Sequence, residues 1–73
     1  MARPYAKLRG LMRENGDTQE DLGRLLLLDR SGISARMNNR ADWKLGEMYA
    51  IMTRYRLPHE MLNQVFPMNG KNG

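Results

Sequence analysis

Four side chains that could make specific non-covalent contacts lie close together in one short segment of this chain: Arg30, Ser31, Ser34 and Arg36. No group of residues near them is of the types that carry out covalent chemistry. We predict two short helices within residues 18–39, joined by a tight connection, and these four residues would lie in the second helix. Two short helices of which the second is basic are typical of a helix-turn-helix DNA-binding motif.

Catalytic and metal-binding chemistry find little support in the composition. The chain has no cysteine and one histidine, His59, which lies between Pro58 and Glu60 and has no set of partners for metal binding. Hydrolytic catalysis needs a nucleophile, a base and a group that orients the base. The acidic cluster of Asp17, Glu20 and Asp21 is explained by the positive N-terminal dipole of the helix that follows. We therefore expect no enzyme activity, no cofactor and no metal site.

Charge is separated into blocks along the chain, whose net charge is +4. Residues 1–16 and residues 30–44 each contain four cationic residues against one acidic residue, whereas residues 17–29 contain one against four. Nine of the twelve cationic residues are arginine, which makes paired hydrogen bonds to phosphate and to guanine that lysine cannot make. The blocks favour an anionic partner, although a solvated surface of mixed charge is the alternative.

The length of 73 residues predicts one small domain. The absence of cysteine leaves close packing of apolar helix faces as the stabilising contribution and fits a reducing cytoplasm. No apolar run approaches the roughly 18 residues that a membrane span needs. The N-terminal segment, MARPYAKLRG, lacks the apolar core of a signal peptide. We therefore expect a cytoplasmic location and no membrane partner.

The spacing of apolar residues predicts an all-α fold, a compact domain of five helices. The first helix should cover residues 4–14, with apolar residues on one face at Tyr5, Leu8, Leu11 and Met12. The second helix should begin after Thr18, whose hydroxyl can form a reciprocal capping box with the carboxylate of Asp21. Its apolar face would consist of Leu22, Leu25 and Leu26.

Caps and breakers predict the bounds of the remaining helices. Asp29 can cap the third helix, whose inward anchors would be Ile33 and Met37, and residues 38–39, two asparagines, would end it. Asp42 is the predicted cap of the fourth helix. That helix has the clearest amphipathic spacing in the chain, at Leu45, Met48, Tyr49, Met52 and Tyr55.

Proline divides the rest of the chain. Pro58 should open a fifth helix, whose core-facing residues would be Met61, Leu62, Val65 and Phe66. Residues 67–73 have little to bury and should form a flexible C-terminal tail. We therefore expect residues 1–66 to form the helix-turn-helix DNA-binding domain.

Gly23 is the small residue that two crossing helices would require. Helices that meet at a steep angle approach closely only where the first has no bulky side chain, and Ile33 would pack beneath Gly23. Glycine inside a helix costs about 1 kcal/mol relative to alanine, which favours a packing reason. The alternative is that Gly23 is an incidental weak point in its helix.

Residues in the helix pair are similar to those of the lambda-repressor-like family of phage Cro and CI transcription regulators: Gln19, Glu20, Leu22, Gly23, Leu26, Ile33 and Asn38. The later runs NNRADWKLGEM and IMTRYRLPHEMLNQVF resemble small prophage repressor-like proteins. The resemblance covers residues 5–66. Two positions depart from it: Leu27 replaces the usual turn glycine, and Arg36 replaces a usually apolar residue. Because of these two departures, the resemblance does not fix the turn geometry, and it defines the rotation of the third helix only to within about one residue.

The resemblance implies which residues would contact DNA. The first residues of the third helix face the major groove in that family; carried over, the base-contacting residues are Arg30, Ser31, Ser34 and Ala35. The implied phosphate-contacting residues are Gln19, Arg36, Asn38, Arg40 and Lys44. The alternatives without a DNA contact are a solvated Arg30 paired with Asp29 or Glu20, and a capping role for Ser31.

The resemblance also implies a function and its partners. We expect a sequence-specific DNA-binding transcription regulator of Cro or repressor type that occupies a double-stranded DNA operator in the cytoplasm or nucleoid of a bacterial host. One helix-turn-helix covers too few base pairs for selectivity, so we expect a weak homodimer or a dimer formed on DNA. The alternative is a protein-binding helical module, such as an antirepressor or a phage-encoded inhibitor, because residues 25–28 are four leucines that cannot all face one core.

Overall fold

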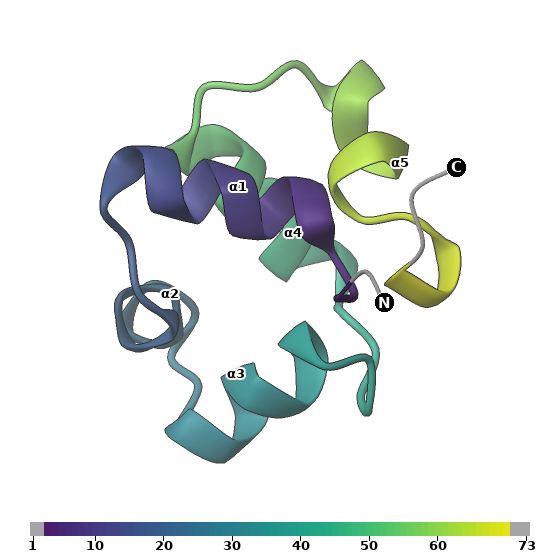
Figure 1. Ribbon diagram of the computed structural model, residues 1–73. Helices are drawn as coiled ribbons and strands as arrows, with labels where there is room; N and C mark the ends of the chain where they lie inside the picture. The colour runs from purple at the N-terminus through teal and green to yellow at the C-terminus, as the bar shows by residue number, and fades with distance from the viewer. Residues whose placement is uncertain (1–2, 71–73) are drawn as a thin grey trace.

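Five α-helices form the scaffold of residues 3–70, the part of the chain that the computed structural model describes (Figure 1). They are α1 (Ala6–Asn15), α2 (Gln19–Leu26), α3 (Arg30–Met37), α4 (Leu45–Arg54) and α5 (Leu62–Val65), with 3₁₀ turns at His59–Met61 and Met68–Gly70. This part of the chain contains no strand, so the prediction of five helices in an all-α fold is confirmed. None of its helices is long and apolar enough to cross a membrane.

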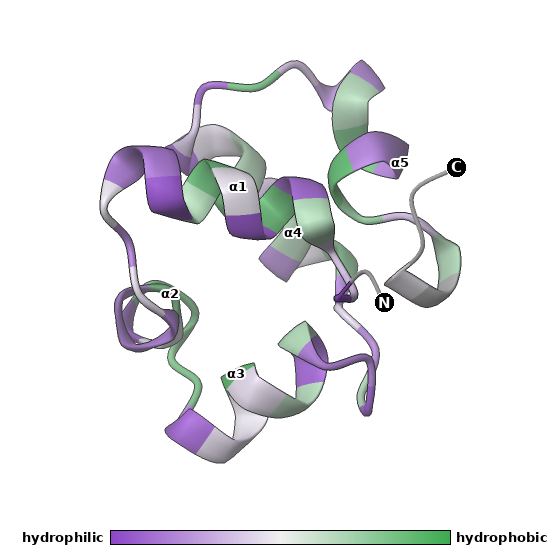
Figure 2. Ribbon diagram, viewed as in Figure 1, coloured by the Kyte–Doolittle hydropathy of each residue, from purple (hydrophilic) through white to green (hydrophobic). Residues whose placement is uncertain are grey.

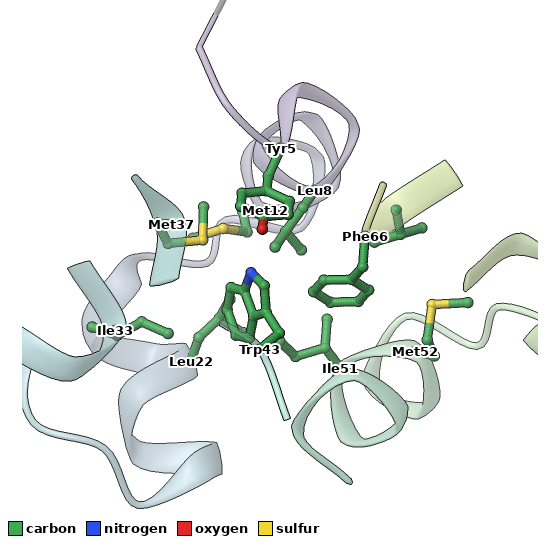
Figure 3. Close-up of a cluster of buried hydrophobic side chains, with 11 residues drawn as sticks. Tyr5, Leu8, Met12, Leu22, Ile33, Met37, Trp43, Ile51, Met52 and Phe66 are labelled. Carbon is green, nitrogen blue, oxygen red and sulfur yellow. The ribbon is translucent and has the colours of Figure 1, made fainter. Parts of the chain in front are cut away.

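One hydrophobic core is built from side chains of every α-helix, of the segments before α1 and α4, and of Phe66 after α5. Figure 2 shows hydrophobic and hydrophilic residues alternating along α1, as expected of a helix with one buried face. Figure 3 shows the side chains of the core pointing toward one another between the helices. The buried residues are Tyr5, Leu8, Met12, Leu22, Ile33, Met37, Trp43, Ile51, Met52, Val65 and Phe66.

Three aromatic rings join the segments that flank the helices. Trp43, in the loop before α4, makes edge-to-face contacts with Phe66, with ring centroids 5.2 Å apart, and with Tyr5 at 6.1 Å. Such pairs add about 0.5–1.5 kcal/mol beyond the burial of their area. Trp43 thus packs the start of α4 against the residues that precede α1 and follow α5.

Local capping rules predicted the starts of α2 and α3 correctly. The backbone N–H of Asp21 donates to Thr18 Oγ1 at 3.2 Å, and the N–H of Thr18 donates to Asp21 Oδ2 at 2.8 Å. At α3, Asp29 Oδ1 accepts from the N–H of Gly32 at 2.7 Å. Asn39 ends the turn after α3 in the left-handed conformation, with φ of 59°, as its sequence position predicted.

The predicted start of α4 was wrong. The helix begins at Leu45, and the N-cap residue is Lys44 rather than Asp42. Glu47, three residues further on, accepts from the backbone N–H of Lys44 at 3.0 Å. A carboxylate at this third helical position satisfies an N–H at the helix start without a capping hydroxyl, and this is the physical reason for the shifted start.

The C-terminal part also differs from the prediction. Pro58 is followed by a 3₁₀ turn, and α5 has four residues because Phe66 precedes Pro67 and leaves helical geometry, with φ of −122°. Of the predicted flexible tail over 67–73, Met68–Gly70 forms a 3₁₀ turn in which Gly70 is buried and its carbonyl accepts from the N–H of Tyr5 at 2.9 Å. Residues 71–73 lie outside the described part of the chain.

Leu27, which ends α2, adopts the left-handed conformation that glycine favours, with φ of 58° and ψ of 40°. Its side chain is 92% exposed, so removing it loses almost no packing. A left-handed conformation costs a non-glycine residue about 1–2 kcal/mol, whereas glycine adds about 0.5–1 kcal/mol of chain entropy to be lost on folding. We therefore expect Leu27→Gly to raise the free energy of unfolding, measured by urea denaturation, by up to about 1 kcal/mol. Leu27→Ala retains the strained conformation and is the control; a Leu27→Gly protein no more stable than Leu27→Ala would contradict this account.

A polar network ties the α1–α2 turn to the end of α4. Arg54 makes two hydrogen bonds to the Asp17 carboxylate, at 2.8 and 2.6 Å, and the Tyr55 hydroxyl donates to the same carboxylate at 2.7 Å. The bonds from Arg54 and then Tyr55 lower the pKa of Asp17 to about 2. Burial, and then the hydrogen bond to Asp17, raise the pKa of Tyr55 above its ordinary value.

This network predicts a specific acid sensitivity. The pKa of Asp17 is lowered to about 2 in the folded protein from its ordinary value of 3.8, so the contribution of Asp17 to stability is complete above about pH 4. That contribution is lost as the pH falls through the interval toward 2, because the unfolded state binds the proton first. Asp17→Asn removes this titration. Urea unfolding at stepped pH should show a smaller loss of stability between pH 4 and 2 in Asp17→Asn than in the parent; equal losses would exclude Asp17 as the titrating group.

Candidate nucleic-acid interface

Helices α2 and α3 are packed closely across a three-residue connection, residues 27–29. Figure 1 shows α2 end-on while α3 lies across the view, so their axes are far from parallel. A Cβ atom built on Gly23 would lie 2.9 Å from the backbone oxygen of Leu28 and 3.8 Å from Ile33 Cγ2. The predicted packing reason for Gly23 is therefore confirmed, and the closest neighbour is the backbone of the connection.

A cleft of about 460 Å³ lies between the N-terminal ends of α2 and α3. Residues that line it include Gln19, Gly23 and Leu28 on the α2 side and Arg30 and Ser34 on the α3 side. Arg30 is exposed, and no acidic side chain among residues 3–70 forms an ion pair with it. Its guanidinium is thus available at the edge of the cleft, and the pairing with Asp29 or Glu20 considered from the sequence is not formed.

The exposed side of α3 carries the other predicted base-contacting residues. Ser31 is exposed in the first turn, and Ser34 is half-buried one turn later. Ala35 is half-buried, and its carbonyl accepts from the N–H groups of Arg40 and Ala41 at 2.7 and 3.2 Å. Ile33 and Met37 are fully buried, which fixes the rotation of α3 so that these three residues lie away from the core.

The Ser34 hydroxyl is held in a network with the segment after α3. Asn38 Nδ2 donates to the Ser34 carbonyl at 2.9 Å and to Ser34 Oγ at 3.3 Å, and Arg40 donates to Ser34 Oγ at 3.5 Å. A hydroxyl has two acceptor sites and one proton. Because its acceptor sites are directed at Asn38 and Arg40, the proton of Ser34 is the part of the group left to bind an outside acceptor.

Arg36 does not belong to this surface, which corrects its prediction as a phosphate contact. Its guanidinium makes two hydrogen bonds to the Glu47 carboxylate, at 2.8 and 3.2 Å, and one to the carbonyl of Gly32 at 3.1 Å. The Arg36 and Glu47 side chains are only 13% and 14% exposed. Arg36 is two positions from Ser34, about 200° around the helix, so it faces α4 and occupies the position that the resemblance expects to be apolar.

Glu47 therefore serves both as the partner of Arg36 and as the cap of α4. Burial raises the pKa of Glu47, but hydrogen bonds from the Lys44 backbone and from Arg36 outweigh burial and hold the pKa below its ordinary value. The carboxylate is thus charged at neutral pH, as the ion pair requires.

The other predicted phosphate contacts are distributed around α3. Gln19 begins α2 and lines the cleft; Asn38 and Arg40 are exposed just after α3; and Lys44 is exposed at the start of α4. Asn38 and Arg40 also hold Ser34, so the structure gives them a positioning contact that the sequence did not indicate.

Sequence reasoning missed the arginines of α1. Arg9 donates to the carbonyls of Pro4 and Met37 at 2.8 and 2.7 Å and to Asn38 Oδ1 at 3.4 Å, which ties α1 to the C-terminal end of α3. Burial, and then the nearby charge of Arg3, lower the pKa of Arg9 from its ordinary value. The available signal was the basic block of residues 1–16, in which Arg9 and Arg13 are spaced for one helix face.

The chain was also compared with known proteins. No protein-family model, no curated protein and no solved structure matches it.

Proposed function

We propose that the protein is a sequence-specific DNA-binding transcription regulator of Cro or repressor type, in which α2 and α3 form a helix-turn-helix. The observation that carries the proposal is the exposed side of α3, where Arg30, Ser31 and Ser34 are presented by a helix that Ile33 and Met37 anchor in the core. In this proposal α3 enters the major groove, where Arg30 can bind the O6 and N7 atoms of guanine in a bidentate manner.

In this proposal the Ser34 hydroxyl has a defined hydrogen-bonding role toward the DNA, as a donor. The hydroxyl accepts from Asn38 and Arg40, so it donates to the DNA. Acceptors in the major groove are guanine O6 and N7, adenine N7 and thymine O4, whereas cytosine offers a donor. Ser34 therefore disfavours cytosine at the base that it contacts.

Gln19, Arg40 and Lys44 contact phosphates in this proposal and set the register of α3 on the duplex. A dimer on a two-fold operator would supply the selectivity that one such module lacks. Occupation of the operator would then block polymerase.

A protein-binding module is the second candidate function, and exposed leucines favour it. Leu25, in the last turn of α2, is 39% exposed, and Leu27, which ends the helix, is 92% exposed. The transcription regulator is expected to bind duplex DNA, whereas the protein-binding module is not.

Selection from random DNA duplexes tests the proposal. We expect a two-fold motif from the parent protein, and we expect Arg30→Ala to lose the preference at one position of each half-site while keeping its helical content. A lost guanine contact costs about 1–3 kcal/mol in affinity for the selected site. Lys7→Ala, which removes an exposed cation of α1, is the charge-matched control and should leave the motif unchanged.

Two outcomes would contradict the proposal in different ways. An unchanged motif with Arg30→Ala would exclude Arg30 as a base-contacting residue. Failure of the parent protein to bind any duplex, even at low salt, would exclude DNA binding and favour the protein-binding module.

A further inference from the structure

A second cleft, of about 450 Å³, lies on the other side of the N-terminal end of α2. Arginines from α1 and from the segment before it line one wall: Arg3, Arg9 and Arg13. Thr18 and Gln19 line the opposite wall. Met37 of α3 also lines this cleft, so the cleft borders α3 as well as α1 and α2.

The charge of this cleft is not balanced from within. Asp17 is the one acidic residue that lines it, and both of its carboxylate oxygens accept hydrogen bonds from Arg54 at 2.8 and 2.6 Å. Arg3 and Arg13 are exposed and form no ion pair with an acidic side chain among residues 3–70. Arg9 is held by the carbonyls of Pro4 and Met37, which position a cation without neutralising it.

The two clefts share residues and so belong to one continuous surface. Thr18 and Gln19 line both of them. An anion in the α1 cleft would therefore lie beside any duplex that α3 contacts, and arginine binds phosphate oxygens in a planar, bidentate geometry.

We propose that the α1 cleft binds a phosphodiester of the DNA backbone next to the groove that α3 occupies, with Arg3 and Arg13 as the contacting residues and Arg9 as a positioning residue. This inference rests on the proposed function and extends the binding surface from α2 and α3 to α1. It adds contacts that do not depend on sequence, because phosphates carry no base identity.

The test measures duplex binding at stepped salt concentrations for Arg3→Ala, Arg13→Ala and the control Lys7→Ala. Lys7 is exposed on α1 and does not line the cleft, so it reports the loss of one charge alone. Each lost phosphate contact should make the slope of log affinity against log salt shallower by about 0.9 per subunit. We expect this change for Arg3→Ala and Arg13→Ala, equally on selected and random duplexes, and a clearly smaller change for Lys7→Ala.

The outcomes separate this inference from the proposed function. If the parent selects a motif but Arg3→Ala and Arg13→Ala change the slope no more than Lys7→Ala, the α1 cleft does not contact DNA, while the proposed function stands. If the parent binds no duplex, both fail together. Inorganic phosphate distinguishes a free anion from the DNA backbone as the ligand of this cleft. It is titrated into the DNA-free protein while the amide NMR signals of Thr18 and Gln19 are followed. Saturation at millimolar phosphate, together with unchanged duplex slopes, would overturn the assignment to the DNA backbone.

Discussion

Replacing Glu47 with alanine is expected to destabilise the fold by about 3 kcal/mol, the lower end of the range for removing one partner of a buried ion pair, because both side chains keep some exposure, 13% and 14%. The variant would leave the Arg36 guanidinium largely buried with no carboxylate. It would also leave the backbone N–H of Lys44 without its acceptor at the start of α4. A domain of this size has a total stability of about 4–11 kcal/mol at 0.05–0.15 kcal/mol per residue, so this loss is a large share of the total.

Urea denaturation of three variants separates the ion pair from the cap. Glu47→Gln keeps an acceptor for Lys44 and Arg36 and should lose less stability than Glu47→Ala. Replacing both partners, by Arg36→Met with Glu47→Gln, removes the unpaired charge and should recover stability relative to Glu47→Ala. Unfolding of Glu47→Ala within about 0.5 kcal/mol of the parent, the usual range for a surface substitution, would contradict the buried pair.

The features that the sequence predicted well depend on residues close together in the chain. The capping of α2 by Thr18 and Asp21 involves a spacing of three residues, and so does the capping of α3 by Asp29 and Gly32. The anchors Ile33 and Met37 follow from helical periodicity. Rules of this kind need no knowledge of the fold, because both partners are fixed by one helical turn.

The features that the sequence missed involve partners from different helices. Arg36 was predicted as a phosphate contact from the resemblance, whereas Glu47 reaches it from α4. The same holds for Arg9, whose main partner is a backbone carbonyl, that of Met37. A carbonyl has no residue-specific signal in the sequence, so this contact could not have been inferred.

Leu27 shows that a left-handed turn can form without glycine. Its left-handed conformation is retained without glycine, because the N–H groups of Leu27 and Leu28 are held by the carbonyls of Arg24 and Gly23, at 3.4 and 2.8 Å. The tight connection is thus fixed by the backbone bonds at the end of α2. Its closeness to α2 in turn depends on the absence of a side chain at Gly23.

Gly23→Val should accordingly destabilise the domain by about 3 kcal/mol, at the upper end of the range for overpacking. The added Cβ would meet the backbone oxygen of Leu28 at 2.9 Å, and a backbone carbonyl cannot rotate away as a flexible side chain can. The connection must therefore shift, and with it the start of α3. Differential scanning calorimetry should show a lower melting temperature, and any DNA binding should weaken as α3 moves.

Gly10→Ala is the matched control for that experiment. Gly10 also lies inside a helix, but a Cβ built there meets nothing within 4 Å, so this substitution should stabilise the protein by about 0.4–1 kcal/mol through the unfolded chain. Opposite signs at the two glycines would show that the close approach of α2 to the connection, rather than helix propensity, determines the cost at Gly23. A Gly23→Val protein that melts like the parent would mean that α2 and the connection do not meet there, and the placement of Arg30, Ser31 and Ser34 on α3 would then no longer follow.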